Sequence, residues 1–177
     1  MTARTIMVGR DIDRSLDRIS LEIVERNHGV TELSIVGIHT GGVFLAQRIR
    51  NRIEEREGIA LPSGNLDITL YRDDWSLISQ NPIVKKTDIG FLLEDKRVVL
   101  VDDVIFTGRT IRAAMDAIMD YGRPLSIQLA VLIDRGGREL PIQPDYVGVT
   151  LVPEPGERVD VLLNEKENRD AVILSMR

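Results

Sequence analysis

The feature that most constrains the fold is the run Val98-Val-Leu-Val-Asp-Asp-Val-Ile-Phe-Thr-Gly-Arg-Thr110. The strand predicted over 97–101 is apolar from Val98 onward without alternation, which is typical of a parallel strand buried on both faces. Two adjacent carboxylates end this strand, a tight turn follows, and a helix is predicted from Thr110 to Tyr121. A strand that leads through a short turn into a helix is the repeating unit of an α/β fold.

The same alternation of strand and helix recurs along the chain. Ile12, Leu16, Ile19 and Ile23 form one apolar stripe of a helix predicted over 11–28, with Asp11 as its cap and Gly29 as its end. A second helix is predicted to begin near Val43, and further strands are predicted over 33–38, 66–70, 126–133, 146–152 and 158–163. For 177 residues this pattern predicts a single α/β domain over 1–177 with a mainly parallel sheet.

Residues 71–95 interrupt this rhythm. Polar and charged residues dominate the segment, and Pro82 and Gly90 separate its scattered apolar positions. Connections this long in a compact domain are often functional, so a lid over a binding site is one interpretation. An ordinary solvated hairpin is the other, and the local sequence does not choose between them.

The turn after the acid pair has the chemistry of an anion site. Backbone N–H groups at a helix N-terminus suit a phosphate, the hydroxyls of Thr107 and Thr110 add donors, and Gly108 allows close approach. Arg109 either adds positive charge there or points away. Because carboxylates do not face a phosphate, Asp102 and Asp103 are expected to accept hydrogen bonds from sugar hydroxyls, directly or around Mg²⁺. Together these groups predict a site for a ribose 5-phosphate.

Two other interpretations of the acid pair are weaker. The carboxylates of Asp102 and Asp103 can simply cap the following helix, but that leaves the threonines and Gly108 in the same register unexplained. A phosphoacceptor receiver domain also places acids at a strand end. There the acids follow the first strand, whereas here they follow roughly the third, and no lysine occupies the matching late loop.

A second strand end carries Ile38-His-Thr-Gly-Gly42. Thr40, Gly41 and Gly42 can offer backbone N–H groups to another anion at the start of a helix. Combined with the first turn, this suggests a substrate with two phosphate groups. His39 is either an anion contact or an exposed turn residue, and His28 is interpreted as a helix-end residue.

Composition excludes several other classes of protein. The chain has no Cys and two His, which argues against disulfide scaffolds, thiol nucleophiles and His-rich metal sites. Its net charge of −5 and 4% aromatic content disfavour a wholly basic or base-stacking nucleic-acid binder. The longest apolar run, 129–133, is too short for a bilayer, and the N-terminus lacks a signal-peptide pattern. A cytoplasmic protein without membrane contact is therefore expected.

The run 98–110 closely resembles the motif of type I phosphoribosyltransferases, which bind 5-phosphoribosyl 1-diphosphate (PRPP). Four further segments extend the resemblance over nearly the whole chain and are similar to the PyrR family: Asp67-Ile-Thr-Leu-Tyr-Arg-Asp-Asp74, Thr107-Gly-Arg-Thr-Ile-Arg-Ala-Ala114, Gly122-Arg-Pro124 and Asp134-Arg-Gly-Gly-Arg-Glu-Leu-Pro-Ile142. The resemblance implies the type I phosphoribosyltransferase fold, with a roughly five-stranded parallel core and a small hood. It places the hood and flexible-loop insertion at about 71–95.

The family combines attenuation of the pyr operon with uracil phosphoribosyltransferase activity. The resemblance therefore implies conversion of uracil and PRPP to UMP and diphosphate with Mg²⁺, in a homodimer or larger homo-oligomer. It implies catalytic roles for Asp102, Asp103 and Arg72, with Mg²⁺ at the two aspartates either directly or through substrate hydroxyls. The implied substrate contacts are Thr40 and Gly41 for diphosphate, Val104, Ile105, Phe106, Thr107, Gly108, Arg109 and Thr110 for the 5′-phosphate, and Asp134 and Arg135 beside the base and diphosphate. The implied mobile loop contains Tyr71, Arg72, Asp73, Asp74 and Trp75.

The resemblance also implies binding of pyr leader mRNA on a concave basic surface. Arg138 occupies one of the family's basic positions, whereas Gly137, Gln143 and Val149 replace a His, an Arg and a Lys. Arg10, Arg14 and Arg18 repeat at four-residue steps along one helix, as an RNA surface or as a solvated face paired with acids. Three functions stay open: an active uracil enzyme, an RNA-binding attenuator with residual activity, and a phosphoribosyltransferase for another base.

Overall fold

A five-stranded parallel sheet forms the centre of the molecule. The computed structural model describes residues 3–74 and 83–176. The strand order is β3-β2-β4-β5-β6, and every neighbouring pair is parallel. The strands are β2 (Leu33–Ile38), β3 (Ser63–Leu66), β4 (Arg97–Ile105), β5 (Ser126–Asp134) and β6 (Tyr146–Thr150). The predicted α/β architecture with a parallel core is confirmed.

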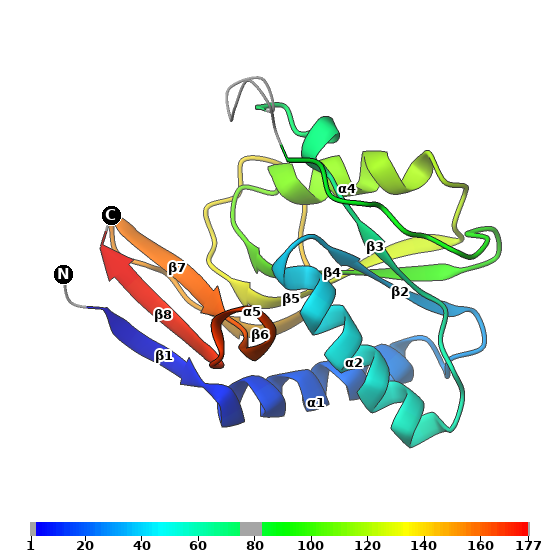
Figure 1. Ribbon diagram of the computed structural model, residues 1–177, viewed down its shortest axis with the longest axis horizontal. Helices are drawn as coiled ribbons and strands as arrows, with labels where there is room; N and C mark the ends of the chain where they lie inside the picture. The colour runs from blue at the N-terminus through cyan, green and yellow to red at the C-terminus, as the bar shows by residue number, and fades with distance from the viewer. Residues whose placement is uncertain (1–2, 75–82, 177) are drawn as a thin grey trace.

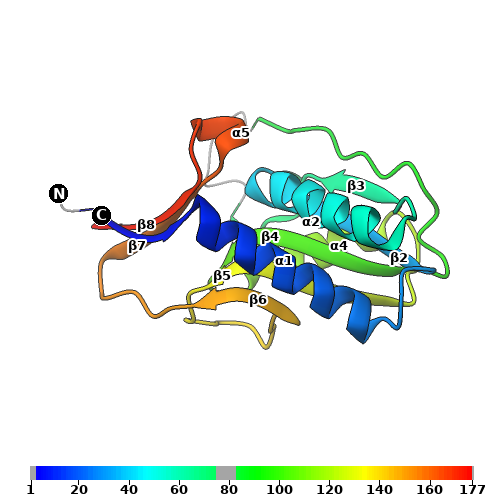
Figure 2. The ribbon, with the colours of Figure 1, turned by 90° about the horizontal axis from the view of Figure 1, so that it is seen from below.

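Helices cover both faces of this sheet and make three layers (Figure 1). The helices α1 (Gly9–Arg26) and α2 (Gly41–Glu57) lie side by side on one face, as the view from below also shows (Figure 2). On the opposite face lie α4 (Arg109–Met119) and the 3₁₀ turn η1 (Thr69–Tyr71). The predicted apolar stripe of α1 is confirmed, since Ile12, Leu16, Ile19 and Ile23 are all fully buried.

A second, smaller sheet is antiparallel and has the order β1-β8-β7. Its strands are β1 (Arg4–Val8), β7 (Glu157–Leu162) and β8 (Ala171–Met176), and the short helix α5 (Asn164–Glu167) lies between the last two. We call β1, β7, α5 and β8 the hood. The hood is built from the two ends of the chain, because β1 and β8 pair with each other (Figure 1). The family resemblance places a hood and flexible-loop insertion at about 71–95, part of which lies outside the described residues, and that placement stays a prediction.

Several predicted boundaries also differ from the structure. The strand predicted over 66–70 is wrong, because β3 ends at Leu66 and η1 follows. The carboxylate of Asp67 accepts hydrogen bonds from the amide (2.9 Å) and hydroxyl (2.6 Å) of Thr69, and this local turn replaces a strand. Asp11 is not the cap residue of α1. It lies inside the first turn, where its carboxylate accepts a hydrogen bond of 3.1 Å from the Val8 amide.

Within the described ranges 3–74 and 83–176, no helix combines the length and apolar character needed to cross a membrane.

Candidate active site

Two adjoining cavities lie where β4 ends. One, of about 260 Å³, is lined by residues 104–111 and by Arg72, Asp73 and Asp74. The other, of about 360 Å³, is lined by Thr40, Gly41, Asp102 and Asp103, among other residues. Arg72, Val104 and Thr110 line both. Carboxyl ends of parallel strands are where open α/β sheets bind ligands, and here two strand ends meet as the sequence predicts.

Residues 104–110, which comprise the end of β4, the turn after it and the start of α4, line the smaller cavity. Gly108 has a φ of +93°, a conformation that strains any side-chain-bearing residue, and it directly precedes the first residue of α4. The amide of Arg109 donates to the Thr107 hydroxyl oxygen at 3.3 Å. The first residues of α4, including Thr110 with its hydroxyl, thus line a hollow suited to a phosphate. We call residues 104–110 the phosphate loop.

The acid pair lies at the edge of the larger cavity. Asp102 is buried, and its carboxylate accepts a hydrogen bond of 2.9 Å from the Asp103 amide, while that of Asp103 accepts one of 2.8 Å from the Val104 amide. Burial and then the neighbouring Asp103 charge raise the pKa of Asp102 well above its ordinary value. Burial likewise raises the pKa of Asp103. Such a pair favours ligands that bring hydroxyl donors or a cation.

The turn before α2 faces this acid pair. Gly41 begins α2, and a methyl group added to it would lie 2.8 Å from Asp103 Cγ, so only a glycine lets the two strand ends approach this closely. Lys85 donates to the Thr40 hydroxyl oxygen and, through its amide, to Asp67. His39 Nε2 lies 3.3 Å from the Lys86 carbonyl oxygen, so this ring contacts the 83–89 segment. Sequence reasoning missed Lys85.

The segment after η1 supplies one wall of the smaller cavity. Arg72 forms a two-point ion pair with Asp74, with both N–O distances 2.9 Å, and this partner holds the pKa of Asp74 below its usual range. Arg109 forms ion pairs with Asp73 (2.6 Å) and Glu139 (2.7 Å), and both Arg109 and Asp73 line the smaller cavity. The hydroxyl of Tyr71 donates to Asp120. Trp75 lies outside the described residues.

The other predicted contacts divide between surface and interior. Arg135 lines neither cavity, and its guanidinium lies 4.1 Å from the centroid of the Phe106 ring. Arg14 is exposed on α1. Arg18 donates to the carbonyl oxygens of Val147 (3.0 Å) and Gly148 (2.6 Å), which ties α1 to β6. The side chain of Arg138 is mostly buried and pairs with Asp134. Both Arg18 and Arg138 are therefore already bound to groups of the protein itself.

The hood contributes residues that sequence reasoning missed. Lys166 and Glu167 of α5 line the larger cavity with Asp102 and Asp103, and so do Val161 and Leu163. Lys166 acts on Asp103 by charge, because its ammonium opposes the rise in the pKa of that carboxyl. In the sequence, the only sign of α5 is that the strand predicted over 158–163 ends there, and such a break does not identify a cavity wall.

An ion-pair cluster fixes the hood to the core. Arg48 of α2 binds Glu165 (2.6 and 2.8 Å) and Asp170 (2.8 and 3.1 Å), and its side chain is only 15% exposed. The guanidinium lowers the pKa of Glu165. For Asp170 burial would raise the pKa, but the guanidinium together with the hydrogen bond from the Asn164 amide lowers it. The same helix that begins at the Gly41 turn therefore also positions α5 over the acid pair.

Residues 8–165 match the family model described as phosphoribosyl transferase domain. The chain is 51% identical over 177 residues to "Bifunctional protein PyrR" of Desulfosudis oleivorans, covering 99% of this chain and 98% of that protein. It is 56% identical over 170 residues to the protein of the same name from Thermoanaerobacter sp., with 96% of each covered. A hypoxanthine phosphoribosyltransferase structure from Trypanosoma cruzi superimposes with a TM-score of 0.72 at 16% identity, covering 98% of this chain and 97% of that one. That likeness supports the fold alone.

Proposed function

Because the chain belongs to the phosphoribosyl transferase family, and within it to the PyrR proteins, we propose that it transfers the phosphoribosyl group of PRPP to uracil, giving UMP and diphosphate, and that it regulates pyr operon mRNA by attenuation. The observation that carries the enzymatic half is the pair of adjoining cavities. One presents a phosphate loop and the other presents two buried carboxylates beside a glycine turn. A ribose 5-phosphate that bears a diphosphate offers one group to each of these: its phosphate to the loop, its hydroxyls to the carboxylates and its diphosphate to the glycine turn.

In the proposed complex the phosphate loop binds the 5′-phosphate through its N–H groups and the hydroxyls of Thr107 and Thr110. Asp102 and Asp103 accept hydrogen bonds from the ribose hydroxyls, and the turn at Thr40 and Gly41 binds the diphosphate. These contacts fix the substrate on both sides of C1′, so together they hold C1′ in place for attack.

Mg²⁺ fits this donor set. In 3–74 and 83–176, no three acidic or histidine side chains gather into a ready-made metal cluster. Mg²⁺ is commonly held by one or two carboxylates together with substrate oxygens, and Asp102 and Asp103 supply those carboxylates. When bound, the ion would neutralise charge on the departing diphosphate.

The chemical step needs little covalent help from the protein. The bond from C1′ to diphosphate oxygen breaks, uracil N1 forms the new bond to C1′, and N1 loses its proton. Asp103, whose pKa burial raises, is the proposed acceptor of that proton and also stabilises positive charge developing on the ribose. Arg72, which lines both cavities, is proposed to act on the anionic substrate as the 71–95 segment closes and excludes water.

The enzymatic half is tested by mixing the protein with PRPP, Mg²⁺ and uracil and following UMP. Hypoxanthine, guanine and orotate in parallel reactions test the alternative of another base. UMP formed from uracil alone supports the assignment. A nucleotide formed only from one of the other bases would contradict it.

The regulatory half is tested by a gel shift with the pyr leader, with and without UMP. Exposed Arg14 on α1 is the proposed RNA contact, whereas Arg18 already binds backbone oxygens of β6. Saturable binding whose affinity falls steeply with salt supports contact with RNA phosphates. Arg14→Gln should reduce the slope of log affinity against log salt concentration by about one, as expected for the loss of one phosphate contact. RNA binding that is insensitive to salt would contradict the proposal that this surface contacts RNA.

We further propose a homodimer or larger homo-oligomer located in the cytoplasm, following the family resemblance. Light scattering over a range of protein concentrations measures the mass of the assembly. A monomer at micromolar concentration would contradict the oligomer.

A further inference from the structure

Arg138, whose sequence position suggested an RNA contact, lies beneath the phosphate loop. We infer that Arg138 is a positioning residue that holds the phosphate loop in its binding conformation. This inference rests on the proposed function, because it concerns how the same site binds a sugar phosphate.

The guanidinium of Arg138 is engaged on every side. Arginine has five N–H donors. Nε donates to the Ile142 carbonyl oxygen (2.9 Å), Nη1 to those of Phe106 (3.0 Å) and Gly136 (3.5 Å), and Nη2 to Asp134 (2.7 Å) and Gln143 (3.2 Å). An RNA phosphate could bind this group only by displacing one of these partners.

One of those partners belongs to the phosphate loop itself. The Phe106 carbonyl oxygen of that loop accepts a hydrogen bond from Arg138, so the guanidinium contacts the backbone of the loop directly. Asp134 ends β5, so the same guanidinium joins the loop after β4 to the end of the neighbouring strand. The side chains of Arg138 and Asp134 are 13% and 14% exposed, which makes this pair much less screened by solvent than the surface ion pairs.

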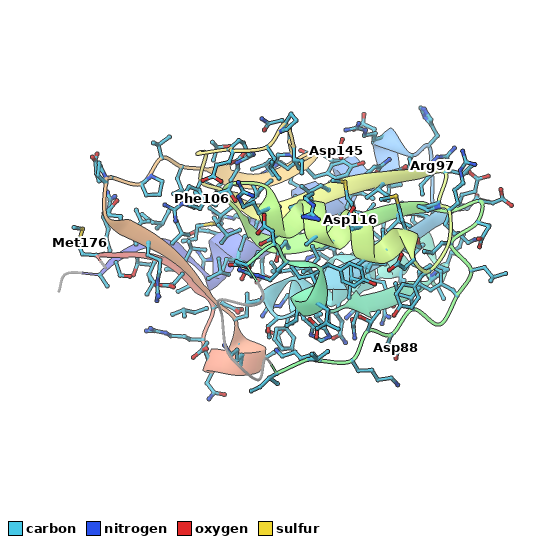
Figure 3. All side chains as sticks on the ribbon, turned by 90° about the horizontal axis from the view of Figure 1, so that it is seen from above. Asp88, Arg97, Phe106, Asp116, Asp145 and Met176 are labelled. Carbon is cyan, nitrogen blue, oxygen red and sulfur yellow. The ribbon has the colours of Figure 1, made fainter. Side chains whose placement is uncertain are left out.

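The segment that carries Arg138 holds Phe106 by other contacts as well. The guanidinium of Arg135 lies over the ring, in a cation–π arrangement. Gly137, with a φ of +74°, lies at the ring edge, where an added methyl group would be 2.5 Å from Phe106 Cε2. Figure 3 shows Phe106 beyond the end of β4, with Arg97 at the opposite end of that strand.

The next residue of the loop is fixed in the same way. The Thr107 carbonyl oxygen accepts hydrogen bonds from the amides of Glu139 (2.9 Å) and Leu140 (3.2 Å). The segment 134–143 therefore supports the outer side of the phosphate loop, and Arg138 is its most connected side chain. A loop that is already ordered loses less conformational entropy when the phosphate binds.

The test compares ligands that use the phosphate loop with one that does not. For Arg138→Met, which keeps the apolar stem, we expect the KM for PRPP and the Kd for UMP by calorimetry to rise about tenfold or more. The KM for uracil should stay within threefold. Gly137→Ala should shift the same two constants in the same direction, by displacing the Phe106 ring.

Two controls separate positioning from general stability. Arg97→Met removes one exposed ion pair, with Glu32, at the far end of β4 and should leave all three constants unchanged. The double variant Arg138→Met with Asp134→Asn also removes the carboxylate that Arg138→Met leaves without its partner. Relative to Arg138→Met alone, it should recover melting temperature but not PRPP affinity. Equal changes for PRPP and uracil, or no change in a folded variant, would overturn the inference. Failure of the wild type to form UMP would instead overturn the proposed function.

Discussion

Gly41→Ala is expected to damage catalysis while leaving the fold intact. Gly41 is the first residue of α2 and its φ is not in the left-handed region, so the backbone accepts alanine. The added methyl would lie 2.8 Å from Asp103 Cγ, and the carboxylate oxygen is nearer still. Ordinary contact begins at 3.4 Å, so the carboxyl group must move by at least about 0.6 Å.

The size of the effect follows from that displacement. A misplacement of about 1 Å costs roughly 10²-fold in rate, so 0.6 Å corresponds to about tenfold, or about 1.4 kcal/mol. The loss is expected in kcat/KM for UMP formation with PRPP. Inside a helix alanine is favoured over glycine by about 0.5–1 kcal/mol, and at the first residue of α2 a smaller gain offsets part of the steric cost to stability. The melting temperature should therefore change by no more than a few degrees.

Two other glycines make the experiment decisive. A methyl on Gly90 meets no atom within 4 Å, so Gly90→Ala should match the wild type in rate and stability. A methyl on Gly42 would press on the backbone of β4, lying 3.0 Å from Asp102 Cα. Gly42→Ala should therefore destabilise the fold by about 3 kcal/mol, lowering the melting temperature by about 6–12 °C. A Gly41→Ala enzyme with kcat/KM within twofold of wild type would refute the close packing of the two strand ends.

Three further predictions concern the hood, the metal and the loop. Arg48→Met should lower the melting temperature by about 4–8 °C in thermal unfolding, because the partly solvated Glu165 and Asp170 lose a cation worth about 2 kcal/mol. Arg48 lowers the pKa of both Glu165 and Asp170 in the folded protein. The stabilisation by these ion pairs is therefore fully present above the ordinary pKa values of 4.5 and 3.8, and it is lost as the pH falls through the lowered pKa values of the folded state. The difference from wild type should close in acid, and a gap independent of pH would contradict the ion-pair origin. Chelation of Mg²⁺ should slow UMP formation at least about 100-fold without changing the far-ultraviolet circular dichroism, and unfolding on chelation would contradict a substrate-bridged ion. Trp75 is the only tryptophan of the sequence, so PRPP should change the intrinsic fluorescence if the 71–95 segment closes, and a flat signal at saturation would argue against closure.

The sequence by itself determined the core of the sheet and the chemistry at its edge. Strands 33–38 and 126–134 are mainly apolar without alternation, and the phosphate loop lies between a buried strand and a helix start that are adjacent in sequence. These features depend on contacts within a few residues, or on burial that any parallel sheet imposes. For the same reason the approach of the Gly41 turn to Asp103 could be expected from two strand ends at one edge.

Only the tertiary structure decided which polar residues face that edge and which hold it together. The hood assembles from both chain ends, so Lys166 and Glu167 enter the cavity through a pairing of β1 with β8 that no local pattern encodes. Arg109 and Arg138 look alike in sequence, yet one extends to exposed acids and the other binds five acceptors beneath the loop. An arginine's residue type gives its charge and donors, whereas its role depends on acceptors that distant segments bring within hydrogen-bond distance.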